Sequence, residues 1–132
     1  MTTTITIPGE FPDMNRIIMA SKRHWSEYAK FKRTYTDLVV AAAKNRHEPI
    51  TEYPVWLTFD WYCKDRRIDP DNIAAAKKMI IDGLVAAGIL TGDGWNHISR
   101  LSDTFHIDRH NTRVTVSLTA ADHHPSKPLT GI

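Results

Sequence analysis

YPVWLTFDWYCK, residues 53–64, alternates strongly apolar side chains with more polar ones over its whole length. A period of two sustained this long predicts a β-strand, because successive side chains of a strand point to opposite faces of the sheet. One face carries Val55, Leu57, Phe59 and Trp61. This is the strongest strand signal in the chain, and the sequence that follows it carries the candidate chemistry.

Weaker patterns on either side complete the order βαβαββ. The expected elements are, in chain order, a strand at 4–7, an irregular basic loop at 11–24, a helix at 26–44, the strand at 53–64, a helix at 70–87 and strands at 98–107 and 113–120. Helices are inferred from apolar residues three and four positions apart, and strands from alternation. The fold class is therefore α+β, with a small mixed sheet and two helices.

The 132 residues fit one domain that buries its own core. We assign residues 1–121 to this domain and residues 122–132, which contain Pro125, Pro128 and Gly131, to a flexible tail. Cys63 is the only cysteine, which excludes an intrachain disulfide and a cysteine zinc cluster.

Nothing in the sequence indicates a membrane. Residues 1–5 lack the basic start and apolar run of a signal peptide, and no stretch approaches the ~20 apolar residues of a span. We therefore expect a cytoplasmic protein, in a bacterium or a phage-infected host. The formal charge of +2 is too small to indicate nucleic-acid binding by itself.

The charge is nevertheless unevenly distributed. Residues 16–33 contain six basic side chains and one acid, Glu27, with Trp25, Tyr28 and Phe31 interleaved. Such a segment can follow a phosphate backbone and stack on bases. The alternative is a solvated helix whose aromatic side chains face the core. The candidate DNA contacts here are Lys22, Arg23, Lys30 and Arg33.

Three carboxylates form the second candidate group. Asp69 and Asp71 follow the 53–64 strand at the start of the next helix, and Asp93 lies in the loop after that helix. Three carboxylates brought together could hold Mg²⁺ against a phosphodiester. The alternatives are structural: Asp69-Pro70-Asp71 suits a plain helix start, and Asp93 between two glycines suits a turn.

Lys78 is the candidate catalytic lysine of this helix. At 100° per residue, Asp71, Lys78 and Asp82 fall on one stripe opposite the apolar side, whereas Lys77 points well away. Because lysine is long and helical side chains lean toward the N-terminus, its ammonium could approach the carboxylates. The alternative is a solvated i, i+4 pair with Asp82.

The run DRRIDPDNIAAAKKMIIDGLVAAGILTGD, residues 65–93, closely resembles the signature of RusA-type Holliday junction resolvases. Asp69, Asp71 and Asn72 match the Asp-x-Asp-Asn motif of that family, and Asp93 matches its distal acid. Lys78 matches the family lysine by standing four residues before Asp82, although it lies about three residues farther from the motif than expected. A second departure is Gly92, where the family often has another acid.

The resemblance implies a Mg²⁺-dependent endonuclease, with Mn²⁺ as a substitute, that cuts four-way junctions as a homodimer. It implies that Asp69, Asp71 and Asp93 hold the metal. These three aspartates and Lys78 would be the catalytic residues. Arg66 and Arg67 flank the motif and could clamp phosphates of branched DNA, or form a salt bridge to Asp65. Two alternatives stay open: a nuclease acting on flaps or forks, and a non-catalytic DNA-binding module.

Overall fold

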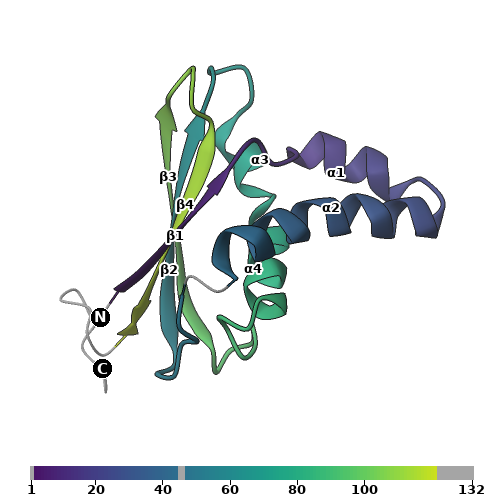
Figure 1. The fold of residues 1–132 in the computed structure, drawn as a ribbon. Coiled ribbons are helices and arrows are strands. Elements are labelled where there is room, and N and C mark those ends of the chain that lie inside the picture. The colour runs from purple at the N-terminus through teal and green to yellow at the C-terminus, as the bar shows by residue number, and fades with distance from the viewer. Residues whose placement is uncertain (1, 45–46, 122–132) are drawn as a thin grey trace, which may run out of the picture.

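The structure, a computed structural model, describes residues 2–44 and 47–121. Its elements are, in order, β1 (Thr2–Pro8), α1 (Met14–Ser21), α2 (Trp25–Ala43), β2 (Val55–Cys63), α3 (Pro70–Ala74), α4 (Lys77–Ala86), β3 (Ile98–Ile107) and β4 (Arg113–Ala120). The expected α+β class is confirmed, with one small mixed sheet (Figure 1). The tail expected at 122–132 lies outside the described residues.

β2 lies inside the sheet, as its long apolar pattern requires. The strand order is β1-β4-β2-β3, in which β2 pairs with β3 in parallel and with β4 antiparallel. A parallel pair needs a crossover connection, and here α3 and α4 supply it. The crossover carries the chain from the end of β2 back toward its beginning before β3 starts (Figure 1).

The core lies between one face of the sheet and the helices. Leu57, Phe59 and Trp61 of β2 point to this side and are almost completely buried. Ile80 and Leu84 of α4 pack into the same cluster. In the described residues the helices lie on one side of the sheet (Figure 1). The odd-numbered face of the 53–64 strand is therefore the core face, as its periodicity predicted.

The prediction of an irregular loop at 11–24 is wrong, because α1 occupies residues 14–21. Asp13 begins this helix: its Oδ1 accepts a hydrogen bond from the Arg16 backbone N–H at 2.9 Å, the usual role of an N-cap aspartate. Only Ala20 of α1 is buried. Met14, Ile17 and Ile18 lie three and four positions apart, but a helix of eight residues is shorter than the window over which periodicity is read.

The prediction of a single helix at 70–87 is also wrong in one respect. It is interrupted at Ala75 and Ala76, where the Ala76 N–H bonds to the Ile73 carbonyl, three residues back, at 3.3 Å. A bond to the third residue back is the tighter 3₁₀ geometry. The turn changes the rotational phase between α3 and α4, so angles counted at 100° per residue from Asp71 do not carry over to Lys78.

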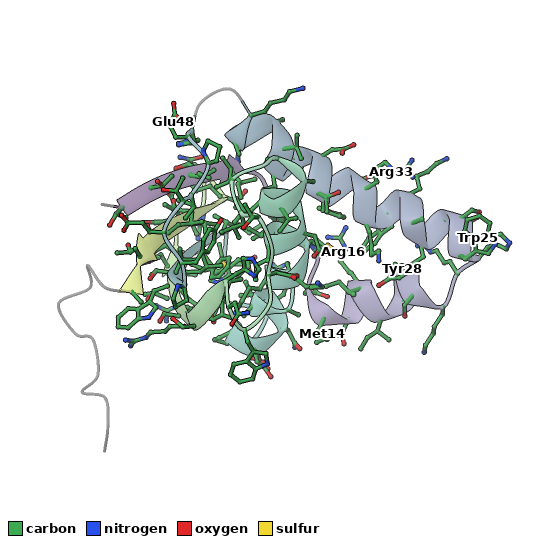
Figure 2. The ribbon with its side chains drawn as sticks, turned by 90° about the horizontal axis from the view of Figure 1, so that it is seen from below. Met14, Arg16, Trp25, Tyr28, Arg33 and Glu48 are labelled. Carbon is green, nitrogen blue, oxygen red and sulfur yellow. The ribbon has the colours of Figure 1, made fainter. Side chains whose placement is uncertain are left out.

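α1 and the first part of α2 form a hairpin that projects from the body, which we call the arm (residues 14–35) (Figures 1 and 2). α1 lies against an aromatic seam of α2, in which the rings of Phe31 and Tyr35 are 5.2 Å apart, centroid to centroid, near Met19 and Ala20 of α1. Arg16 closes the seam by donating from Nη2 to the Tyr35 hydroxyl at 3.3 Å. The buried residues of α2 are Val39 and Ala43, both near its C-terminal end.

Candidate active site

The first part of the site is the start of α3. Asp69 occupies the N-cap position, where its backbone carbonyl accepts from the N–H groups of Asn72 and Ile73, but its carboxylate makes no capping hydrogen bond. Asp71, in the first turn, accepts from the Asn72 N–H through Oδ1 at 3.0 Å. Both side chains are exposed. The helix start thus uses the Asp69 backbone, not its carboxylate.

The second part joins α4 to the loop after it. Lys78 Nζ donates to Asp82 Oδ1 at 2.9 Å and to Asp93 Oδ2 at 3.2 Å. The hydrogen bond to Asp82, followed by the one to Asp93, raises the pKa of Lys78 above its ordinary value. Lys78 is therefore a fixed positive charge near neutral pH. The i, i+4 pair with Asp82 exists, and Lys78 meets the distal aspartate as well.

These two parts are separate in this arrangement. Within residues 2–44 and 47–121, no three Asp, Glu, His or Cys side chains lie close enough together to hold one metal ion. The donor chemistry nevertheless fits Mg²⁺, since Asp69, Asp71 and Asp93 are carboxylates at solvent-accessible positions. Because the three carboxylates do not lie together, a shared metal would require them to move closer. Asp93 also has a cationic partner already, in Lys78.

The loop that carries Asp93 is held by two residues that sequence reasoning missed. The His97 N–H donates to the Gly94 carbonyl at 3.0 Å, and the Tyr53 hydroxyl accepts from the Thr91 N–H at 3.0 Å. The rings of Tyr53 and His97 meet edge to face with centroids 5.2 Å apart. Neither residue belongs to a motif, so only the fold reveals this support.

Gly92 explains why this loop has one acid instead of two. A Cβ added at residue 92 would lie 2.7 Å from Cε1 of His97, closer than side-chain carbons approach without displacement. An aspartate at this position would therefore have to push the imidazole aside. His97 and Gly92 fit each other in this structure, and Asp93 is the carboxylate that this loop presents.

Lys77 points toward the sheet, away from Asp93. Its Nζ donates to Asp103 Oδ2 on β3 at 2.6 Å, and both side chains are only about one-fifth exposed (20% and 21%). The same carboxylate accepts at Oδ1 from the Trp61 indole N–H at 2.9 Å. Lys77, Asp103 and Trp61 form a structural network between the crossover and the sheet. Sequence reasoning missed Asp103, which stands in an ordinary strand pattern.

The two arginines before the motif differ. Arg67 Nε lies 3.6 Å from Asp65 Oδ2, and the Arg67 backbone N–H bonds to Asp65 Oδ1 at 3.0 Å. Arg67 therefore adopts the rim salt bridge that the sequence left as an alternative, on a side chain that is 88% exposed. Arg66 is exposed as well. Both side chains can still reach a phosphate, because surface ion pairs of this kind are weak.

The remaining candidate DNA contacts lie on the arm. Lys22 and Arg23 connect the two helices, and Lys30 and Arg33 are exposed on α2. Arg23 and Lys30 line one shallow hollow together with Glu27, Phe31 and Thr34. Figure 2 shows Arg33 on the side of α2 that faces away from α1, and Trp25 at the far end of the arm. The arm is thus a basic projection with Trp25 at its far end (Figure 2).

No protein-family model matches this chain, and no curated protein matches it either. In the described residues, no helix is both long and apolar enough to cross a bilayer.

Proposed function

We propose that this protein is a Mg²⁺-dependent, structure-selective DNA endonuclease that resolves four-way junctions, a RusA-type resolvase. The observation that supports this most directly is the Lys78–Asp93 contact. It joins a lysine of the crossover helix to the aspartate beyond it, two residues that a plain helix start and a plain turn would have no reason to bring together. Asp69 and Asp71 begin the same crossover.

Each residue has a proposed role. Asp69, Asp71 and Asp93 would hold Mg²⁺, which when bound supplies charge neutralisation at the phosphate and a more acidic water. Lys78, kept protonated by its two carboxylate partners, offsets the negative charge that develops on the phosphate. Arg66 and Arg67 hold the neighbouring phosphates.

The arm extends the proposed contact with DNA beyond the site. Lys22, Arg23, Lys30 and Arg33 would bind the phosphates of one junction arm. Two opposed strands of a junction must be cut, so we propose a homodimer, in which a two-fold axis presents two sites to a two-fold substrate. Such an enzyme works where DNA recombines, in the cytoplasm of a bacterium or an infected host cell.

Aspartate-to-asparagine variants test the proposal. Asp69→Asn, Asp71→Asn and Asp93→Asn should each lower Mg²⁺-dependent cutting of a synthetic four-way junction by ~100-fold or more, because a metal ligand contributes several kcal/mol to the transition state. Junction binding should persist or tighten, since a negative charge facing phosphates has been removed. Cutting, binding and melting temperature are measured for each variant.

Asp37→Asn is the matched control, because Asp37 is an exposed aspartate of α2 outside the candidate site. It should cut at the wild-type rate. Near wild-type cutting by all three site variants would instead favour a DNA-binding module whose acids only begin a helix. Faster cutting of flaps or forks than of four-way junctions by the wild type would favour the other branched-DNA nucleases.

A further inference from the structure

Trp95 is 96% exposed, more than any other large apolar side chain in the described part of the chain. An indole normally buries most of its surface, since its area makes it one of the strongest contributors to cores and interfaces. Trp95 lies two residues after Asp93, in the loop that leads into β3. Such an exposed indole, in the same loop as a candidate catalytic residue, is typical of a side chain that contacts a ligand.

The indole and the candidate site share one groove. This broad groove, of about 630 Å³, is lined by Trp95 together with Lys78, Asp93, Arg100 and several apolar side chains. Lys78 and Asp93 are the pair already joined at 3.2 Å. Anything that lies across Trp95 therefore lies next to the residues proposed to act on the phosphodiester.

The groove also has the charge that a nucleotide needs. Lys78 and Arg100 line it as cations, and its one carboxylate, Asp93, is hydrogen-bonded to Lys78. The Arg100 guanidinium lies over the Trp56 ring, 4.6 Å from its centroid, which holds this cation at the groove. An apolar protein surface would have to desolvate these charges, whereas a nucleotide offers phosphate to the cations and a flat base to the indole.

We propose that Trp95 stacks on an unpaired nucleobase next to the phosphate that is cut. This rests on the proposed endonuclease function and deepens it: the bound substrate is DNA in which a base at the branch point is unpaired, or becomes unpaired on binding. Stacking on a tryptophan depends little on base identity, because every base has an aromatic face. Trp95 would then favour branched over continuous duplex DNA through a contact with the base that is independent of the phosphate contacts.

Binding without divalent metal tests this separately from catalysis. Trp95→Ala should weaken binding of a short oligothymidylate by roughly 10-fold, with little change in binding of a fully paired duplex of equal length. Trp95→Phe, which keeps an aromatic face, should retain most of the affinity. Because the indole is solvated, all variants should melt near the wild-type temperature. Ile107→Ala is the control, because Ile107 is an exposed apolar side chain of β3, at 50%, outside both the groove and the arm.

Three results would overturn the inference: unchanged oligothymidylate binding by Trp95→Ala, an equal loss of duplex binding, or an equal loss in Ile107→Ala. Sedimentation addresses the remaining occupant, since a wild-type dimer that becomes monomeric in Trp95→Ala would make the groove an interface between copies and would also overturn it. Failure of the endonuclease proposal appears elsewhere, as an absence of metal-dependent cutting, and leaves these binding measurements interpretable.

Discussion

Lys77 and Lys78 are neighbours in the chain with different partners in the fold. Lys78 reaches Asp82 and Asp93 at the surface, and its side chain is 70% exposed. Lys77 is held between the crossover and β3 by Asp103. The helical angle predicted that the two would diverge, because adjacent helical residues are about 100° apart. It could not predict Asp103, which comes from a distant strand.

Alanine at each lysine should therefore give opposite results. Lys78→Ala should lose most of the Mg²⁺-dependent cutting with little change in stability, since exposed ion pairs contribute little to folding. Lys77→Ala should lower the free energy of unfolding by about 1–3 kcal/mol, because it leaves the Asp103 carboxylate largely buried with one donor fewer. Junction cleavage and denaturant unfolding of both variants are the measurements. The opposite assignment of the two losses would make Lys77 the catalytic candidate.

The charge on Lys78 should be insensitive to pH over the working range. Its carboxylate partners raise its pKa above the ordinary 10.5, so its positive charge is present below that pH and is lost only as the pH rises through the higher folded-state value. Lys78→Arg, which keeps a positive charge at all these pH values, should give a pH–rate profile of the same shape as the wild type below pH 10.5. A falling limb present only in the wild type below that pH would contradict this.

At the scale of elements, α2 and α4 pack at a glycine. A Cβ added at Gly83 would lie 2.5 Å from the Cβ of Val39 and within 2.9 Å of both its methyl groups. The two helix backbones therefore approach as closely as they do because residue 83 has no side chain. Val39 and Gly83 are both buried, and their contact fixes where α2, and with it the arm, joins the body.

Gly83→Ala should consequently destabilise the protein. Because the added Cβ would lie only 2.5 Å from the Cβ of Val39, we expect a cost near the upper end of the ~1–3 kcal/mol typical of overpacking, which exceeds the ~1 kcal/mol that alanine gains over glycine in a helix. Gly94→Ala is the control, because an added Cβ there comes no closer than 4.0 Å to a neighbouring heavy atom. Equal unfolding free energies for the two variants would show that the helices do not need this close approach.

Elements with a long strand or helix pattern were predictable, including β3, which buries none of its residues completely yet has the expected range of 98–107. β4 buries alternate residues and β2 does so from Leu57 to Trp61, so the period of two located them closely. α1 carries Met14, Ile17 and Ile18 three and four positions apart, but it is only eight residues long and buries only Ala20, so its pattern was too short to predict a helix. The turn at Ala75 and Ala76 lies in a run of alanines, which are good helix formers, so local propensity gave no sign of it.

The whole molecule consists of a body with a projecting basic arm, and this shape carries the next prediction. Lys30→Ala combined with Arg33→Ala should weaken junction binding and make the slope of log K against log salt shallower by roughly two, since each lost phosphate contact removes nearly one released counterion. Lys44→Ala, at the other end of α2, should leave the slope unchanged. An unchanged slope in the double variant would show that Lys30 and Arg33 contact solvent and not phosphate.

The candidate site was predictable in its residues but not in its assembly. The motif at Asp69 and Asp71 and the aspartate at residue 93 are local features of the sequence. How far apart they lie depends on the turn between α3 and α4 and on the loop supported by Tyr53 and His97. Those contacts join segments far apart in the chain, so no local pattern reports them.

The anchoring of α2 makes the arm a lever. Its buried residues, Val39 and Ala43, lie at one end, and Trp25 stands fourteen positions from Val39 at the other. Fourteen residues of helix span about 21 Å, so a tilt of ~5° at the Val39–Gly83 contact would swing Trp25 by about 2 Å. That is more than half the ~3.4 Å step between stacked bases. Substitutions inside the core could therefore shift the position at which the arm meets a DNA duplex while leaving every DNA-facing residue unchanged.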